Sequence, residues 1–185
     1  MALMPLKIAL TGSIACGKSL FAKFLRELGV QTLDADDIVH ELIPAEERRR
    51  LAPIVFADPV ARKALEARIH PLVRERFDAW FTSQTSQTSQ TPILKLAIIP
   101  LLFECNWDAD YDIIICISSP AEEQIRRMVE TRGLTREAAE ARLSAQLPVS
   151  EKAARSHYVV VNDSTVEHLR EEAVRCVEWL RSRQS

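Results

Sequence analysis

Apolar positions along this chain follow two patterns. Near-continuous apolar runs rich in β-branched residues are typical of parallel strands covered on both faces, and they occur at residues 93–99, 113–117 and 158–161. Residues 6–10 are predicted to form a first buried strand and residues 30–33 a short second one. Between these runs, apolar residues recur with a helical period, as in the segment after Gly17. Strand and helix therefore alternate, which predicts an α/β, three-layer fold with right-handed crossovers around a five-stranded parallel sheet. The pattern by itself does not reveal the strand order.

Capping residues mark several helix starts. Asp58 stands before a proline and predicts a helix that reaches beyond Pro71, where the ring is expected to kink or split it. Ser119 and Ser164 each precede a glutamate by three residues, the spacing of a capping box. Residues 83–91 read SQTSQTSQT and carry no apolar side chain, so we interpret them as a solvated linker.

Composition narrows the function classes. The chain of 185 residues is 47% hydrophobic and 27% charged with a net charge of −2, which predicts one globular domain and argues against a general nucleic-acid or membrane-surface binder. The longest apolar stretch, residues 96–103, is much shorter than the roughly 20 residues that cross a bilayer. The start of the chain does not resemble a secretory signal, and the scattered cysteines lack metal-ligand spacing. We therefore expect a cytoplasmic protein with reduced thiols.

Two of the four glycines fall in the segment GSIACGKS. It matches G-x-x-x-x-G-K-[ST], and it follows a predicted strand and opens a predicted helix, as a phosphate-binding loop requires. In such a loop, backbone N–H groups surround the phosphates, the lysine contacts the β- and γ-phosphates, and the serine hydroxyl binds Mg²⁺. A chance turn is the alternative. The pattern predicts nucleotide contacts from Gly12, Ser13, Ile14, Ala15, Cys16, Gly17, Lys18, Ser19 and Leu20.

An acidic pair follows the second predicted strand. The apolar runs at residues 93–99 and 113–117 are followed by Pro100 and Ser118 and not by the aspartate of an ATPase-type metal site, and no N-K-x-D occurs. Asp34 and Asp36 are therefore the obvious acidic candidates. Asp36 is predicted to accept a substrate hydroxyl proton and, with Ser19, to bind the metal, while Asp34 supports it or points elsewhere. The alternative for both residues is a helix N-cap.

Five arginines crowd the segment after the fourth strand: Arg126, Arg127, Arg132, Arg136 and Arg142. A lid of this kind clamps phosphate oxygens and neutralises developing charge. Most of the five are expected to form a solvated helical face, with one or two acting on the phosphates.

Taken together, these residues resemble the dephospho-coenzyme A kinases over nearly the whole chain. The shared features are TGSIACGKS, the DAD at residues 34–36, His70-Pro71, PLLFE at residues 100–104, and a tail of Arg142, Gln146, Lys152 and Val161-Asn162. The resemblance implies ATP- and Mg²⁺-dependent phosphorylation of the ribose 3′-hydroxyl of dephospho-coenzyme A, the last step of coenzyme A biosynthesis. It also implies a P-loop kinase fold with sheet order 2-3-1-4-5, a helical lid and a shortened helical acceptor region.

The resemblance also assigns roles. It implies Asp36 as general base, Lys18 and Ser19 as phosphate and metal contacts, and Arg142 as the lid arginine. On the acceptor side it implies Asp34, His70, Leu102 and Glu104, and it places Asn162 at the adenine. For His70 and Glu104 the alternatives are packing against a helix and capping of a loop.

The expected regions form a single kinase domain. A core spans residues 1–36, 92–120 and 156–185, an acceptor-side helical region spans 37–82, the linker spans 83–91 and the lid spans 121–155. We expect a monomer or weak homo-oligomer acting on a small molecule without nucleic acid or membrane. The alternatives are another small-molecule or nucleoside-monophosphate P-loop kinase, and a non-catalytic nucleotide-binding protein.

Several positions depart from the family pattern. Ser13, Ala15 and Cys16 stand where the family usually has Gly, Gly and Ser, and a β-carbon fits only where the backbone needs no positive φ. Thr131 stands where an early lid arginine is usual. The segment between residues 43 and 48 is shorter than usual. Cys16, beside the phosphate-binding amides, suggests a further hypothesis of oxidative inactivation without nucleotide.

Overall fold

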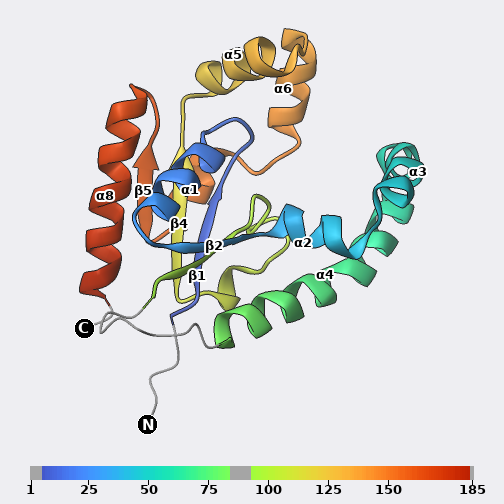
Figure 1. The fold of residues 1–185 in the computed structure, drawn as a ribbon. Coiled ribbons are helices and arrows are strands. Elements are labelled where there is room, and N and C mark those ends of the chain that lie inside the picture. The colour runs from blue at the N-terminus through green and yellow to red at the C-terminus, as the bar shows by residue number, and fades with distance from the viewer. Residues whose placement is uncertain (1–5, 84–92, 184–185) are drawn as a thin grey trace. The chain divides into compact units, whose positions relative to one another are not determined.

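The computed structural model describes residues 6–83 and 93–183, in which strands and helices alternate as predicted (Figure 1). The elements are β1 (Ile8–Gly12), α1 (Lys18–Glu27), β2 (Gln31–Asp34), α2 (Ala35–Leu42), α3 (Ala45–Ala57), α4 (Pro59–Thr82), β3 (Lys95–Ile98), the 3-10 helix η1 (Asp108–Asp110), β4 (Ile113–Ser118), α5 (Ala121–Arg132), α6 (Arg136–Ser144), α7 (Val149–Ala154), β5 (Tyr158–Val161) and α8 (Val166–Ser182). Most of the linker expected at 83–91 lies outside the described residues.

The five strands form one sheet in the order β2-β3-β1-β4-β5. Ile8 of β1 pairs in parallel with Leu96 of β3 on one side and with Ile113 of β4 on the other, and β4 pairs in parallel with β5. The expected fold class and strand order are confirmed. Because parallel strands end at one edge, the segments that follow β1, β3, β4 and β5 meet at the carboxyl edge of the sheet.

Helices cover both faces of the sheet. On one face α1 and α8 pack against each other, and Phe21 and Leu169 lie in the same apolar cluster as the β-strand residues Leu10 and Ile115 (Figure 1). On the other face α7 packs against β1 and β4. All five residues of β1 are buried, which explains why the strand reads as an apolar run rather than an alternating one.

The chain forms two compact units. One comprises residues 1–32 and 88–185 and contains most of the sheet and the expected lid segment, residues 121–155. The other comprises residues 33–87 and contains α2, α3 and α4, which include the expected acceptor-side region, residues 37–82. In this second unit α4 contacts both α2 and α3, and Ile38, Ile69 and Phe77 are buried.

The structure confirms the cap predicted at Asp58, shows no split of the helix at Pro71 and corrects the cap predicted at Ser119. Asp58 caps α4 as predicted, since it accepts a hydrogen bond from the N–H of Val60 at 2.8 Å. Pro71 lies inside α4 but does not split it. Ser119 does not cap α5, whose N-cap is Pro120, because the Ser119 hydroxyl instead donates to the carbonyl of Asn162 at 2.8 Å.

The capping box predicted at Ser164 is displaced by one residue. Thr165 is the N-cap of α8, and its side chain accepts from the N–H of His168 at 3.2 Å. Within the described ranges, none of the helices is long and apolar enough to cross a membrane.

Candidate active site

The glycine-rich loop, residues 12–19, lies at the carboxyl edge of the sheet, between the end of β1 at Gly12 and the start of α1 at Lys18. N–H groups in the first turn of a helix have no partner within that helix, and the helix dipole adds partial positive charge there. Among the described residues, no protein acceptor binds the N–H groups of Ala15, Cys16 and Gly17. The loop therefore offers a series of free donors suited to an anion such as phosphate.

Both glycines of the loop are required by close contacts. A β-carbon on Gly12, whose φ is 142°, would lie 2.4 Å from the carbonyl oxygen of Ile117 on β4. A β-carbon on Gly17, whose φ is 100°, would lie 2.3 Å from the side-chain nitrogen of Asn162. Neither contact leaves room for a side chain, so the glycine spacing of the sequence reflects how tightly the loop is packed.

The two non-glycine substitutions in the loop differ. Ala15 has a φ of 57°, in the left-handed region, whereas Ser13 is not among the residues with positive φ in the described chain. The left-handed conformation is costly for a residue with a β-carbon, by about 1–2 kcal/mol. The Ser13 side chain is buried, and its hydroxyl has no hydrogen-bond partner among the described residues. The substitution at Ala15, not the one at Ser13, thus places backbone strain in the loop.

Lys18 folds back over the loop. Its ammonium donates to the carbonyls of Gly12 and Ser13, both at 2.7 Å, and lies 3.7 Å from the Cys16 sulfur. These carbonyls hold the charge at the loop, where the free N–H groups also lie. An ammonium group has three donors and is mobile on its flexible side chain, so it can redirect a donor to a phosphate.

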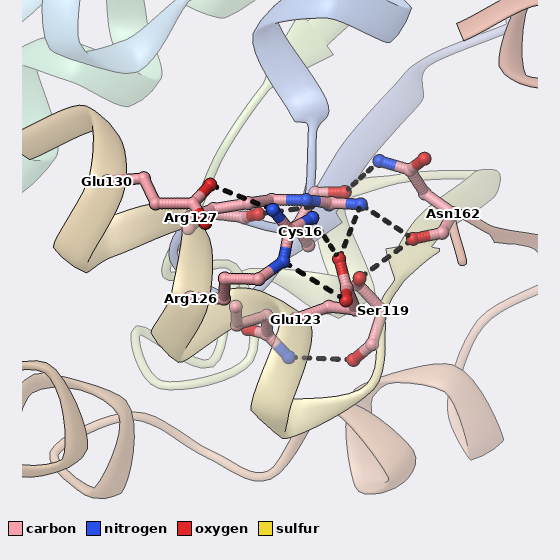
Figure 2. Close-up of polar contacts among 9 residues, drawn as sticks. Cys16, Ser119, Glu123, Arg126, Arg127, Glu130 and Asn162 are labelled. Atoms are coloured by element: carbon pink, nitrogen blue, oxygen red, sulfur yellow. Dashed lines mark hydrogen bonds and ion pairs between the residues drawn. The ribbon is translucent and has the colours of Figure 1, made fainter. Parts of the chain in front are cut away.

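Three side chains from distant parts of the sequence hold the loop from outside. Asn162, just after β5, donates to the Cys16 carbonyl at 2.9 Å, and Arg127 of α5 donates to the Ala15 carbonyl at 3.3 Å (Figure 2). Gln146, after α6, accepts from the N–H of Ile14 at 2.9 Å. Asn162 is buried, so its amide supports the loop, and its predicted contact with adenine stays a prediction.

Sequence reasoning did not assign Arg127 or Gln146 to the loop. Arg127 stands four residues after Glu123, at 3.8 Å from its carboxylate, a spacing that also occurs in ordinary surface ion pairs of a helix. The contact to Ala15 spans 112 residues and the contact of Gln146 to Ile14 spans 132, so no local pattern reveals them.

Of the five arginines singled out in the expected lid, the four besides Arg127 fall into two groups, paired and unpaired among the described residues. Arg126 pairs with Glu123 and Glu130 on its own helix, and Arg136 pairs with Glu122 and Glu140 (Figure 2 shows Arg126). The hydrogen bond from Arg126 to Glu123 raises the pKa of Arg126 and holds the pKa of Glu123 below its usual range. These two arginines form a solvated face, as expected for most of the five.

Arg142, the predicted lid arginine, lies in the last turn of α6 and is exposed. No hydrogen bond or ion pair of its side chain occurs within residues 6–83 and 93–183. Arg132 is likewise exposed and unpaired within those ranges. Unlike Arg126 and Arg136, these two guanidinium groups keep all their donors available for an anion.

The PLLFE segment, residues 100–104, is joined to α7 by an ion pair of a buried lysine. Lys152 is fully buried, and its ammonium lies 2.7 Å from the Glu104 carboxylate and 3.0 Å from the Pro100 carbonyl. The same Glu104 oxygen accepts from the N–H of Leu147 at 3.0 Å. Leu102 is fully buried, so its predicted contact with the acceptor stays a prediction. Glu104 therefore supports the loop that follows β3, and its predicted contact with the acceptor stays a prediction.

The acidic pair belongs to the start of α2. Asp34 is the N-cap of this helix and accepts from the N–H of Asp36 at 2.9 Å, which agrees with the capping alternative for Asp34. The Asp36 side chain is exposed, and no described residue forms a hydrogen bond or ion pair with it. His70 is half-buried in α4. Asp36 is thus free to accept a proton.

The two residues predicted to bind Mg²⁺ carry suitable ligand atoms. Ser19 and Asp36 both expose an oxygen ligand of the hard type that Mg²⁺ prefers. The described residues contain no cluster of three or more His, Cys, Asp or Glu that could hold a metal ion by itself. Mg²⁺ commonly binds one or two protein oxygens together with water and substrate phosphates, and each of these residues by itself carries an oxygen of that type.

One buried thiol belongs to the loop and another to β4. Cys16 and Cys116 of β4 are both fully buried. Burial raises the pKa of the Cys116 thiol to about 12, with the neighbouring Cys16 as the next cause. A buried Cys16 is poorly placed to meet an oxidant, so the structure offers no support for the predicted oxidative inactivation.

Comparison with known proteins identifies the family. The chain matches the dephospho-CoA kinase family model over residues 6–47 and 45–168. A dephospho-CoA kinase of Symbiobacterium thermophilum is 37% identical over 88% of this chain and 76% of its own length. One from Thermus thermophilus is 35% identical over 94% of this chain and 90% of its own length.

Comparison with solved structures supports the same family. A Thermus thermophilus protein with 35% identity superposes with a TM-score of 0.77 and covers 94% of this chain and 96% of its own. The dephospho-CoA kinase of Campylobacter jejuni, 26% identical, gives a TM-score of 0.71 with 97% and 98% coverage. A shikimate kinase of Acinetobacter baumannii, 20% identical, shares the fold with a TM-score of 0.60 and 97% and 94% coverage. From its sequence and its fold, this chain belongs to the dephospho-CoA kinase family.

Proposed function

We propose that this enzyme transfers the γ-phosphate of ATP to the ribose 3′-hydroxyl of dephospho-coenzyme A, giving coenzyme A and ADP. The observation that carries the proposal is the loop at residues 12–19, in a chain of the dephospho-CoA kinase family: its N–H groups at Ala15, Cys16 and Gly17 have no acceptor among the described residues and lie next to a helix N-terminus. The two alternatives, another P-loop kinase and a non-catalytic nucleotide-binding protein, have less support, because the curated relatives share the dephospho-CoA kinase name over most of this chain.

In this proposal, the loop and Lys18 bind the phosphates of ATP. The free N–H groups of Ala15, Cys16 and Gly17 and of the first turn of α1 donate to phosphate oxygens. Lys18 exchanges one carbonyl contact for a β- or γ-phosphate oxygen. These donors are in place before the reaction starts, so they stabilise charge on the transferring phosphoryl group with little reorganisation.

In this proposal, Asp36 accepts the proton of the acceptor hydroxyl. The acceptor 3′-oxygen forms a bond to the γ-phosphorus, the bond from that phosphorus to the bridging oxygen breaks, and ADP leaves with the bridging oxygen. The hydroxyl proton goes to the Asp36 carboxylate, whose exposure leaves it available as a base. Mg²⁺, when bound with ATP through Ser19 and Asp36, supplies charge neutralisation for the phosphates.

The lid and the acceptor side complete the proposal. Arg142 has no pairing partner among the described residues and is proposed to clamp the γ-phosphate from the lid. Asp34, His70, Leu102 and Glu104 are proposed to line the acceptor side, with Asp34 and Glu104 acting chiefly by fixing the local backbone.

The test is an acceptor panel analysed by mass spectrometry. Purified protein is incubated with Mg-ATP and either dephospho-coenzyme A or a common nucleoside monophosphate. Lys18→Ala protein, purified in the same way, controls for a kinase carried over from the expression host. Coenzyme A as the sole new product, absent with Lys18→Ala, is the expected result. Phosphorylation of a nucleoside monophosphate instead, or ATP binding without any phosphorylated acceptor, would overturn the proposal.

A further inference from the structure

We propose that Arg127 is a positioning residue for nucleotide binding: it holds the Ala15 carbonyl from the lid side and thereby aims loop N–H groups at the phosphates. The inference rests on the proposed function in so far as the loop binds ATP. Arg127 donates from Nη1 to the Ala15 carbonyl at 3.3 Å and from Nη2 to the Asn162 carbonyl at 3.2 Å (Figure 2). One guanidinium thus joins the loop to the end of β5.

The geometry of the peptide bond explains how an outside contact orients an inward donor. In a planar trans peptide, the carbonyl oxygen and the following N–H point in opposite directions. Arg127 holds the Ala15 carbonyl, so the N–H of Cys16 points away from Arg127. Asn162 holds the Cys16 carbonyl in the same way, at 2.9 Å, and so directs the N–H of Gly17. Both N–H groups are among those without a protein acceptor in the described chain.

Arg127 contacts the loop at a residue whose backbone conformation is strained. Ala15 has a φ of 57°, a conformation that glycine adopts readily and alanine does not. Without an external contact, the Ala15 peptide would turn to a more favourable conformation for part of the time, and the fraction of loops competent to bind phosphate would fall. Apparent nucleotide affinity falls in proportion to that fraction.

Further contacts fix the same turn to the lid. Ile14 and Ala15 pack against the small apolar cluster that Ile125 and Met128 of α5 form with Ala139 of α6. On the other side, Gln146 accepts from the N–H of Ile14 at 2.9 Å. The turn at residues 14–15 is therefore held by α5, by α6 and by the segment after α6.

The surroundings of Arg127 separate this role from a direct phosphate clamp. Its side chain is 23% exposed and its two terminal nitrogens already donate to carbonyls, while Glu123 lies 3.8 Å away. Arg142, by contrast, is exposed with no described partner. Arg127 acts through the loop, whereas Arg142 is the arginine available to a ligand.

The experiment is a double-mutant cycle read by ATP binding. Calorimetric titration with Mg-ATP compares wild type, Arg127→Met, Ala15→Gly and the double variant. Arg126→Met is the matched control, because Arg126 is the preceding arginine on α5 and, within the part of the chain that the structure describes, pairs with Glu123 and Glu130 but not with the loop. Urea unfolding of each variant checks that the fold is intact, and Arg127→Lys replaces Arg127→Met in the cycle if the latter does not fold.

We expect Arg127→Met to weaken ATP binding about tenfold, with kcat at saturating ATP within about twofold, and Arg126→Met to bind as wild type does. In the Ala15→Gly background the loss falls to about threefold or less, because glycine adopts the left-handed conformation without help. An equal loss in both backgrounds would assign Arg127 to direct contact with ATP and overturn the proposal, as would unchanged binding in Arg127→Met. Because the readout is binding, the result does not depend on which acceptor is phosphorylated.

Discussion

The loop at residues 12–19 and the start of α2 at residues 34–37 carry the two halves of the proposed chemistry, and they are stabilised in opposite ways. The loop is held by Arg127, Gln146 and Asn162, which lie 112, 132 and 146 residues from the positions they contact. The start of α2 is held by Asp34, which bonds to the N–H two residues further along.

The difference follows from what each region must do. A backbone loop binds phosphate only if several peptide planes are oriented at once, and each has rotational freedom that another part of the molecule must remove. A general base needs one exposed carboxylate, which a local helix cap positions well enough until the substrate arrives. Contacts from distant parts of the sequence thus hold the loop that binds phosphate through its backbone, and a local contact is enough to position the side chain of Asp36.

The largest effect is expected at the start of α2, from the substitution Asp36→Asn. Removing a general base typically lowers turnover by about 10² to 10⁴, while ATP binding through the loop should stay nearly unchanged. Steady-state kinetics with dephospho-coenzyme A gives the turnover, and calorimetry gives the ATP affinity. Asp37→Asn, at the next exposed position of α2, is the control and should behave as wild type does. Wild-type turnover in Asp36→Asn would remove this residue from the mechanism.

On the loop side, Lys18→Ala should weaken both ATP binding and turnover. A hydrogen bond to a charged group contributes about 1.5–3 kcal/mol, so the affinity should fall roughly tenfold to a hundredfold. The same calorimetric titration measures the change, and Lys23→Ala, an exposed lysine of α1, serves as the control. If Lys18→Ala lowered turnover alone, with unchanged affinity, the loop would not depend on this lysine for binding.

A contact between distant segments in the same unit as the loop can be tested at the buried charge of Lys152. Glu104→Gln leaves this ammonium, which is fully buried, without its carboxylate partner at 2.7 Å. Because Glu104 is partly exposed, we expect the free energy of unfolding to fall by about 2 kcal/mol, below the range for fully buried pairs. Urea unfolding measures it.

Two further variants interpret that result. Glu151→Gln, an exposed residue of α7, is the control and should change stability little. Adding Lys152→Met to Glu104→Gln should restore part of the loss, because no buried charge then remains. A double variant less stable than Glu104→Gln alone would show that the ammonium contributes through its contact with the Pro100 carbonyl instead.

The smallest expected effect is a loss of stability at alkaline pH, caused by ionisation of buried cysteine thiols. It concerns only the unit that holds the loop, because residues 33–87 contain no cysteine. Burial raises the pKa of Cys116 and of Cys176 to about 12. The unfolded chain therefore loses these protons first, and the stability from the neutral buried thiols is present below about pH 9 and is lost as pH rises toward 12.

Cys116→Ala should reduce that loss. The slope for one thiol is about 1.4 kcal/mol per pH unit, so the free energy of unfolding should fall by about 1 kcal/mol less between pH 9 and pH 10 than in wild type. Urea unfolding at the two pH values gives the difference. An unchanged slope would mean that the Cys116 thiol is not protected from ionisation in the folded state.

Most of the fold was predictable from the sequence because its signals are local. The apolar runs correspond to β1–β5 within a few residues, and Asp58 caps α4. The caps at Ser119 and Ser164 were not correctly predicted, because a serine with suitable spacing can be used elsewhere. Ser119 instead donates to the carbonyl of Asn162, a contact across 43 residues that no spacing rule reveals.

For the site, the sequence identified the chemistry, but it left the supporting residues unassigned. The motif GSIACGKS and the acidic pair were readable because each occupies a few consecutive positions. The contacts of Arg127 and Gln146 were not readable, since a Glu–Arg spacing of four residues on a helix looks like a surface pair.

The sequence alone determined the alternation of strand and helix, the loop motif and the exposed acid, because these depend on residue types at short spacing. The resemblance to known kinases added the strand order. Only the tertiary structure decided that Ala15 takes the left-handed conformation, that Arg127 and Gln146 hold that turn, and that Lys152 is buried against Glu104. These features arise where chain segments more than 40 residues apart meet at the carboxyl edge of the sheet, and the energy of such contacts depends on the folded geometry rather than on neighbouring residues.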